Sequence, residues 1–533
     1  MKKEFSLMKM ENRFGGKSFP QNVVHSLLFI TVTFLLLFVS DTFIEMWVLP
    51  KRLFGCLGGA SFILLFSVFR LLNSAVTFPS LRYQTSCIVC NICILIIFSW
   101  ISYLSSHEKY MSGTFDNPAG LATALVLSTP FVIRYQNNLP WKFITTTILL
   151  ITMCATQSRI GMLCLMGYFL VNLKIAIRLK WTLMILAAVT TVILFLYKAQ
   201  STEGRLFIIS QTLEIIGKSP WKGNGLNGFS LLYMPHQAAF FAQNPTSPYA
   251  LLADNIGHPL NEYLYICTNI GLIGLMIVSF VYFILLRTVF RIPQMACYCQ
   301  SLILLLILSV GTYPFHYPFT WFILSASIIN ALNATIRQNR YRKLILLICM
   351  SGALAVVINT ITLVKTEITW NRTFENTRIM NPKNAIPLLD DFFLVKKNDE
   401  FYLYTFAESL IDAGEYKRAE NVVRLRGNLL HDYYQEYLYA KLFECNGDFD
   451  KAAPHYLLAS NMCPSKFYPL YKSYMMYKQL GRRDICVQLI ERTKRKKIKI
   501  ITANAVMLRD AVLRDSVLWE PLLDSLSVGP MSQ

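Results

Sequence analysis

Long uninterrupted apolar runs are the feature that most limits what this chain can fold into. Each is roughly 16 to 24 residues long, enough for a helix to cross about 30 Å of hydrocarbon with its backbone hydrogen bonds satisfied internally. Only 15% of the residues are charged, whereas soluble domains contain about 25%. The sequence therefore predicts an all-α fold, a polytopic helical membrane protein.

We expect about eleven transmembrane helices, at residues 22–39, 53–71, 85–104, 119–133, 142–157, 160–177, 181–197, 263–286, 297–312, 320–336 and 343–363. The N-terminal tail, residues 1–21, is basic and is predicted to be cytoplasmic. Alternation then places the long loop 198–262 and everything after about residue 363 on the outer face. Lys51 and Arg52 also fall on that face, against the positive-inside trend.

The net charge of +20 does not indicate a nucleic-acid partner, because most basic residues before residue 345 lie in short segments between apolar runs. The cysteines indicate neither a metal site nor disulfides. Most of the 13 cysteines lie inside apolar runs, where cysteine behaves as a small hydrophobic residue. Cys87, Cys90 and Cys93 have no second Cys or His pair to complete a site. We therefore predict no metal site and no disulfide framework.

Two arginines and a histidine are predicted to converge on the outer face. Arg159 lies at a corner between two apolar runs, Arg205 lies early in the long loop, and His258 lies near its end. A guanidinium group can bind two phosphate oxygens at once and remains charged. A histidine can accept a proton near neutral pH. Each arginine alone could equally be a snorkelling anchor or a helix cap. Together, the three residues suit a phosphate-bearing substrate beside a reacting hydroxyl.

Other outer-face residues are weaker candidates. Asn261 and Glu262 follow the histidine, and Asn117 lies in another outer loop, so all three are possible assisting residues. His316, between prolines and aromatic residues, is more typical of a packed loop histidine. In the stretch WKGNGLNGF, residues 221–229, the lysine precedes the glycines and no GK[ST] follows, unlike a phosphate loop, so a structural turn is favoured.

The C-terminal part has soluble composition and a repeat. We predict a linker at 364–397 and a periplasmic domain at 398–533. Small residues recur at a spacing of 33 or 34 positions, which is the period of tetratricopeptide (TPR) repeats, stacked helix pairs that form an α-solenoid. The recurring positions are Ala407, Gly414 and Ala419, then Ala440, Gly447 and Ala452. A third copy is degenerate, with Tyr474 at the first position, followed by Gly481 and Cys486. Such a domain binds a partner protein, or alternatively acts as a structural cap.

The order of the membrane motifs resembles the O-antigen ligase (Wzy) superfamily. The resemblance is carried by Ser158–Arg159, Gly204–Arg205, Pro220 to Phe229, His258 to Leu264, and Gly271 to Gly274. It covers roughly residues 110–335. Members often have a histidine directly before the asparagine, a place that Leu260 occupies here.

The resemblance implies a GT-C-like transmembrane domain, residues 22–363, in the bacterial inner (plasma) membrane. It also implies metal-independent transfer of a glycan from a polyprenyl (undecaprenyl) diphosphate carrier, without a cofactor, on the periplasmic side. The acceptor would be lipid A core, a protein hydroxyl or another glycan. Arg159 and Arg205 would hold the donor diphosphate, and His258 would act catalytically at the acceptor.

Several alternatives remain open. A protein O-oligosaccharyltransferase and a repeat-unit polymerase would use the same site as a lipopolysaccharide ligase. A glycolipid transporter would show charged residues within spans and two-fold hydropathy repeats. A TPR membrane scaffold would leave the outer arginines and histidine unexplained. Membrane lipids are partners in every case.

Overall fold

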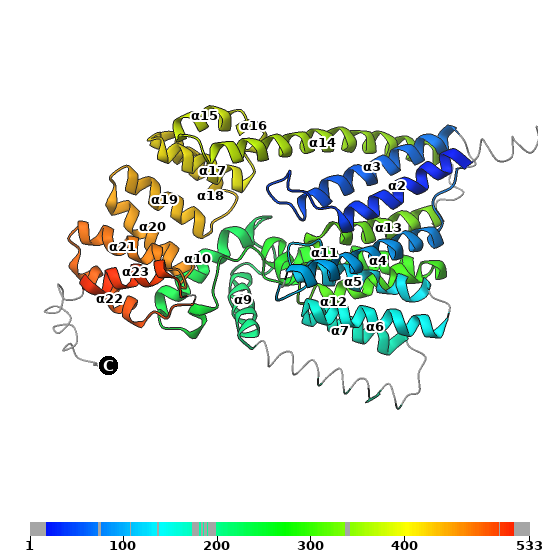
Figure 1. Cartoon of the computed structure of the whole chain (residues 1–533), viewed down its shortest axis with the longest axis horizontal. Helices are drawn as coiled ribbons and strands as arrows, with labels where there is room; N and C mark the ends of the chain where they lie inside the picture. The colour runs from blue at the N-terminus through cyan, green and yellow to red at the C-terminus, as the bar shows by residue number, and fades with distance from the viewer. Residues whose placement is uncertain are drawn as a thin grey trace, which may run out of the picture. The chain divides into compact units, whose positions relative to one another are not determined.

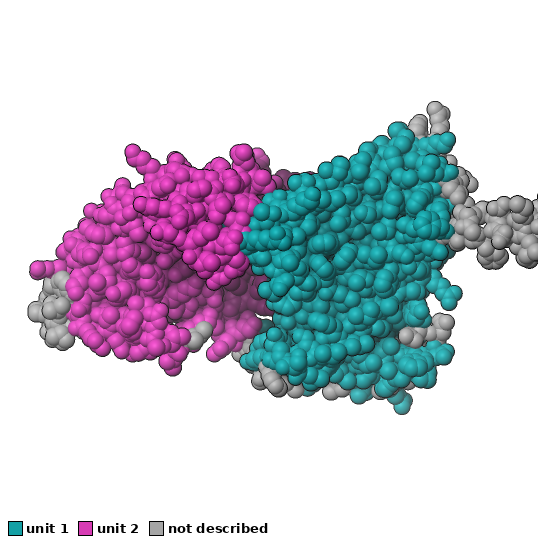
Figure 2. All heavy atoms as spheres, turned by 45° about the horizontal axis from the view of Figure 1, so that its top comes forward, with its two compact units in different colours: residues 1–195, 278–372 teal, residues 196–277, 373–533 magenta. Residues whose placement is uncertain are grey.

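The computed structural model describes residues 18–515 apart from 73–75, 107, 136–137, 336–341, 500 and most of 173–198. Within these residues all regular structure is helical (Figure 1). The chain forms two compact units (Figure 2). Unit 1 comprises Met1–Phe195 and Val278–Arg372, and unit 2 comprises Leu196–Ile277 and Thr373–Gln533.

Unit 1 is a bundle of apolar helices. It contains α2 (Ser18–Leu37), α3 (Leu49–Leu72), α4 (Leu81–Ser106), α5 (Pro118–Tyr135), α6 (Leu139–Thr156), α7 (Arg159–Asn172), α12 (Ala296–Leu308), α13 (Pro318–Thr335), the end of α11 (Glu262–Phe290) and most of α14 (Arg342–Thr377). Of the described helices, α2, α3, α4, α11 and α14 are long and apolar enough to cross a membrane. The chain is therefore a multi-pass membrane protein. The predicted span 181–197 lies almost entirely outside the described residues, and the count of eleven stays a prediction.

Helix α5 forms the centre of unit 1. Every residue from Gly120 to Val132 is buried, and α4, α6, α7, α12 and α13 all pack against it. A helix that is apolar on all sides must be surrounded by other helices, which explains why a short predicted span, 119–133, takes this position.

The first part of unit 2, residues 196–277, contains α9 (Ala199–Lys218), α10 (Gly228–Gln243), the short helix η1 (Pro248–Leu251) and the start of α11. Helix α9 packs on both α10 and η1. Phe207 on α9 stacks on Tyr249 of η1, with ring centroids 5.0 Å apart, and also contacts Phe241 of α10. The loop predicted at 198–262 is thus a small helical core.

Three helix hairpins follow in the C-terminal part of unit 2. They are α17 (Glu400–Asp412) with α18 (Tyr416–Gly427), α19 (Tyr433–Cys445) with α20 (Phe449–Met462), and α21 (Tyr468–Gln479) with α22 (Arg483–Arg495), followed by α23 (Ala503–Arg514). Gly414, Gly447 and Gly481 occupy the equivalent turn in each hairpin and have φ of 84°, 82° and 68°. That left-handed conformation ends a helix most readily at glycine. The repeat is therefore structural, while its identity as a TPR stays a prediction.

Residues 364–397, the predicted linker, contain the end of α14, α15 (Pro382–Asp390) and α16 (Phe393–Lys396). The hairpins also pack directly on the loop 198–262, through α10 and α20 (Figure 1). Gln237 Nε2 donates to the carbonyl of Met462 at 2.6 Å, across 225 positions of sequence. Phe229, Tyr233 and Met462 belong to one buried cluster. The loop and the hairpins therefore share a hydrophobic core.

A buried carboxylate joins the second hairpin to its preceding turn. Glu436 is hydrogen bonded to His431 at 2.5 Å and to His455 at 2.6 Å. Burial raises the pKa of Glu436, but the two histidines outweigh burial and leave the pKa below its usual 4.5. The backbone N–H of His431 also donates to the carbonyl of Ser230 in α10 at 3.1 Å. This carboxylate therefore supports the contact between hairpins and loop.

Candidate functional site

A glycine-lined backbone crossing holds the start of α11 in place. Helix α11 breaks at Gly271, whose φ of 69° and ψ of −174° are accessible essentially to glycine alone. The turn of residues 220–225 lies across this break. Asn224 N–H donates to Thr268 O at 2.9 Å, and Leu272 N–H donates to Pro220 O at 2.8 Å. The two glycine motifs therefore bond to each other, and the glycine stretch is a structural turn.

His258 and Glu262 form a pair at the N-terminal end of α11. His258 Nε2 lies 3.6 Å from Glu262 Oε2, and the Glu262 side chain is 9% exposed. The imidazole ring stacks on Tyr265 with centroids 4.6 Å apart. The backbone N–H of Leu260 donates to His258 Nδ1 at 3.0 Å, so the neutral ring carries its proton on Nε2, which faces the carboxylate. The ring and the carboxylate therefore face each other at the start of α11.

The turn between the two members of this pair is strained. Leu260 has φ of +56°, a conformation that costs a bulky L-residue free energy and that often marks functional sites. Asn261 begins the helix that follows, because its Oδ1 accepts the backbone N–H of Leu264 at 3.0 Å. Asn261 is therefore a helix cap, and the strained turn sets the position of the histidine.

Arg159 lies at a tight corner in unit 1. Helix α6 ends in the left-handed residue Gln157, and α7 begins at Arg159. The hydroxyl of Ser158 caps α7 by accepting the N–H of Gly161 at 3.3 Å. Arg159 is 8% exposed and sits at the positive end of the helix dipole, which disfavours a cation. The same helix N-terminus favours an anion, so the anion-binding role predicted for Arg159 stays a prediction.

Arg205 and His258 belong to unit 2, whereas Arg159 belongs to unit 1. Arg205 lies in the second turn of α9 and is half-buried. Its neighbour Phe207 packs in the core between α9, α10 and η1, so the arginine is carried on a packed helix. The convergence of the two arginines with the histidine stays a prediction.

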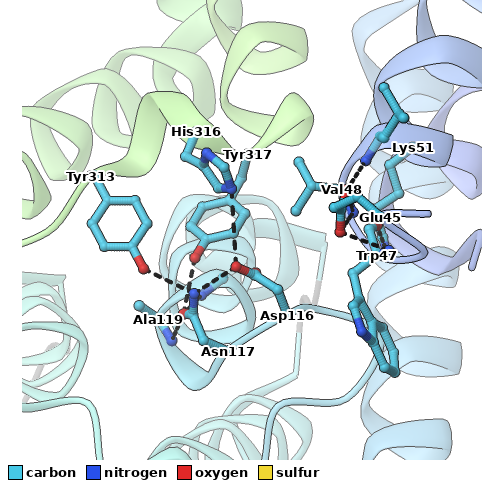
Figure 3. Close-up of polar contacts among 12 residues, drawn as sticks. Glu45, Trp47, Val48, Lys51, Asp116, Asn117, Ala119, Tyr313, His316 and Tyr317 are labelled. Carbon is cyan, nitrogen blue, oxygen red and sulfur yellow. Dashed lines mark hydrogen bonds and ion pairs between the residues drawn. The ribbon is translucent and has the colours of Figure 1, made fainter. Parts of the chain in front are cut away.

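A second polar cluster lies in unit 1, where residues 45–51, 114–119 and 313–317 meet (Figure 3). Lys51 is completely buried. Its ammonium donates to the carbonyl of Trp47 at 3.0 Å and to that of Thr114, and lies 5.0 Å from the centroid of the Phe115 ring. Sequence reasoning counted Lys51 as a loop charge, because the Thr114 carbonyl and the Phe115 ring that surround its ammonium come from a distant segment.

Asn117 is the helix cap of α5. Its Oδ1 accepts the N–H of Ala119 at 2.8 Å and the hydroxyl of Tyr317 at 2.9 Å, while its Nδ2 donates to Asp116 at 2.8 Å and to the Tyr313 hydroxyl at 2.9 Å (Figure 3). An amide has two donor hydrogens and two main acceptor sites. The side chain is thus fully engaged in structure, which disfavours the assisting role expected for it.

His316 is also part of this cluster. Its Nε2 lies 3.9 Å from Asp116 Oδ2, a longer separation than a hydrogen bond (Figure 3). The ring packs edge-on against Tyr313 and Tyr317. His316 is therefore an exposed residue at the end of the short helix η3 (Pro314–His316), in contact with two tyrosine rings and with a carboxylate nearby. Within the described residues, His, Cys, Asp and Glu side chains form no group of three that could hold a metal ion.

The segment 144–279 matches the family described as O-antigen ligase. The matched residues include Arg159, Arg205, the glycine crossing and the His258–Glu262 pair. A search of curated proteins found no match for the chain. The family match supports the O-antigen ligase superfamily and indicates a membrane glycosyltransferase.

Proposed function

We propose that the chain transfers a glycan from a polyprenyl diphosphate carrier to an acceptor hydroxyl on the periplasmic side of the bacterial inner membrane. The observation that carries the proposal is the His258–Glu262 pair, placed by a strained turn at the head of α11 and lying within the family-matched segment. Lipid A core, a protein and a growing glycan are the acceptor classes.

Arginines would bind the donor. As the acceptor oxygen bonds to the anomeric carbon, the bond from that carbon to the phosphate oxygen breaks, and its electron pair leaves with the diphosphate. Arg159 and Arg205 would neutralise the charge that develops there, since fixed guanidinium groups stabilise it without reorganising. The position of Arg159 at the N-terminus of α7 supports this role, because the helix adds partial positive charge.

The histidine pair would act on the acceptor. The attacking hydroxyl must lose its proton, and the His258–Glu262 pair would receive it. In the neutral ring, the lone pair of Nδ1 already accepts from Leu260. The carboxylate of Glu262 would therefore take the proton, with His258 Nε2–H orienting it. Glu262 thus becomes as important as the histidine.

Complementation of a deletion strain tests the proposal. The strain receives wild-type protein, Arg205→Lys, His258→Ala or Glu262→Gln, and the readouts are the lipopolysaccharide ladder, glycoprotein mobility and glycan chain length. Arg205→Lys loses the paired hydrogen bonds of the guanidinium, worth about 1.5–3 kcal/mol, or roughly ten- to a hundredfold in rate. His258→Ala and Glu262→Gln should abolish transfer at normal protein levels.

His236→Ala is the matched control. His236 also pairs with a glutamate, Glu214, at 3.0 Å, and lies on α10 of the same unit. It is outside the strained turn, so its loss should leave the glycan profile unchanged. Normal transfer by His258→Ala, or equal loss in His236→Ala, would contradict the assignment of the pair.

A further inference from the structure

A cavity in unit 2 opens directly beside the histidine turn. Its volume is about 540 Å³, and its wall includes Asn255, Ile256 and Gly257, the three residues that precede His258. Small-molecule sites typically enclose roughly 300–1,000 Å³. The opposite wall comes from the first two helix hairpins, so the C-terminal domain contributes to a site beside the proposed catalytic pair.

A preorganised polar network forms the floor of this cavity. Arg426 and Asp432 are each only 4% exposed. Arg426 Nη1 donates to Asp432 Oδ1 at 2.9 Å, and Asn255 Nδ2 donates to Asp432 Oδ2 at 3.1 Å. The amide, the carboxylate and the guanidinium are planar groups held in fixed positions. Further hydrogen bonds within the protein hold them there. Arg426 also donates to the carbonyl of Glu400 and to Gln435 Oε1, and Asp432 accepts the backbone N–H of Gln435. The network therefore fixes the shape of the cavity floor.

Aromatic rings form the sides. Phe401 is 41% exposed and Tyr434 is 42% exposed, and both line the cavity. Tyr434 packs edge-on against Tyr404, with centroids 5.7 Å apart, so its position is fixed although its surface remains open. The exposed rings match the apolar C–H face of a sugar, and the exposed carboxylate of Glu400 in the cavity wall can accept hydrogen bonds from its hydroxyls.

Charge excludes the main competing ligand. One guanidinium, Arg426, faces two carboxylates of the lining, Glu400 and Asp432, and Arg426 is already paired with Asp432. A phosphate or diphosphate would meet net negative charge here. The donor diphosphate would therefore lie with Arg159 and Arg205, and an uncharged ligand suits this cavity.

We propose that this cavity is a saccharide subsite in which the helix hairpins hold a sugar next to His258. The proposal rests on the glycosyltransferase function proposed above and extends it. The C-terminal domain then selects which sugar reaches the catalytic pair, which gives the shared hydrophobic core of loop and hairpins a functional purpose.

Binding is tested without relying on transfer. Saturation-transfer difference NMR is recorded on the full-length protein in nanodiscs with a panel of methyl hexopyranosides and N-acetylhexosamines. At least one sugar should receive saturation from wild-type protein. Tyr434→Ala should weaken binding about three- to tenfold, the value of one aromatic contact, whereas Tyr434→Phe retains the ring and should bind nearly normally.

Leu425→Ala is the matched control, because Leu425 is 38% exposed on α18 and does not line the cavity. No saturation of any sugar by the wild-type protein would overturn the proposal, as would equal weakening in Leu425→Ala. If peptides received saturation from the wild-type protein and no sugar did, the cavity would be a peptide site and the proposal would be overturned. Sugar binding in a protein that transfers no glycan would retain the subsite and refute the proposed function.

Kinetics then identify the source of the sugar. A KM for the acceptor that rises about three- to tenfold in Tyr434→Ala, with an unchanged KM for the donor, assigns the cavity to the acceptor. The reverse pattern assigns it to the glycan of the donor. Unchanged KM values for both, in a variant that has lost sugar binding, would refute a role for the cavity in transfer.

Discussion

Substitution of Gly271 by alanine should disrupt the backbone crossing beneath the proposed catalytic pair. A Cβ at this position would lie 2.3 Å from the carbonyl oxygen of Trp221 and 2.6 Å from the backbone nitrogen of Gly223. Both are backbone atoms, so no side-chain rotation relieves the overlap. The φ of 69° with ψ of −174° is in addition a conformation that alanine avoids.

The expected cost is large. Backbone strain contributes about 1–3 kcal/mol, and overpacking against fixed atoms contributes about 1–3 kcal/mol more. Loss of the Leu272 and Ile273 hydrogen bonds to residues 220 and 221 adds about 1 kcal/mol each. The sum, about 4–8 kcal/mol, is a major part of the stability of a typical domain.

Two matched variants separate strain from overlap. Gly225 has φ of +91° but no atom within 4 Å of an added Cβ, so Gly225→Ala should cost strain alone, about 1–2 kcal/mol. Gly217 is helical with open space around it, and Gly217→Ala should be neutral or stabilising by about 0.5–1 kcal/mol. Thermal unfolding of the purified full-length proteins, followed by intrinsic fluorescence and limited proteolysis, should rank them in this order. Equal melting of Gly271→Ala and Gly225→Ala would refute the crossing as a close backbone contact.

Three further predictions concern the C-terminal domain and the topology. Deletion of residues 395–533 should prevent stable folding of the loop 198–262. The deletion exposes the shared hydrophobic core, in which each large buried side chain contributes about 1.5–3 kcal/mol. Normal yield and protease resistance of the truncated protein would contradict the shared core. The folded pKa of Glu436 is lowered, so its carboxylate contributes stability that is fully present above about pH 4.5 and is lost as the pH falls through the folded pKa. Glu436→Gln should therefore have a lower melting temperature than the wild type at pH 7, and the two melting temperatures should converge in acid. A difference in melting temperature that stays constant from pH 7 into acid would contradict the lowered pKa of Glu436. A reporter that works only in the periplasm should be active when it is fused after Lys365. Activity of a reporter that works only in the cytoplasm, fused at the same place, would overturn the proposed sidedness.

The sequence by itself determined those features that depend on near neighbours. Apolar runs indicated membrane helices, because hydrocarbon leaves no other way to satisfy a backbone. The corner at Ser158–Arg159 followed from two runs with no loop between them. The repeated Gly414, Gly447 and Gly481 indicated stacked helix pairs, and the structure gives all three a positive φ at the turn of each pair. A helix end needs left-handed backbone, which glycine supplies locally.

Contacts between distant residues were decided by the tertiary structure. The sequence shows glycines near 223 and at 271 but not that their backbones cross, because that depends on where α11 breaks. It marked Lys51 as a loop charge, whereas packing buries it among carbonyls and an aromatic ring. The sequence placed a linker between the hairpins and the membrane domain, whereas Gln237 of the loop donates a hydrogen bond to Met462 of the hairpins, 225 positions away. Periodicity indicates which face of a helix is apolar, but only packing decides which element covers that face. Here the helix hairpins cover the loop, and together they line an aromatic and charged cavity at residues 255–257, directly before His258.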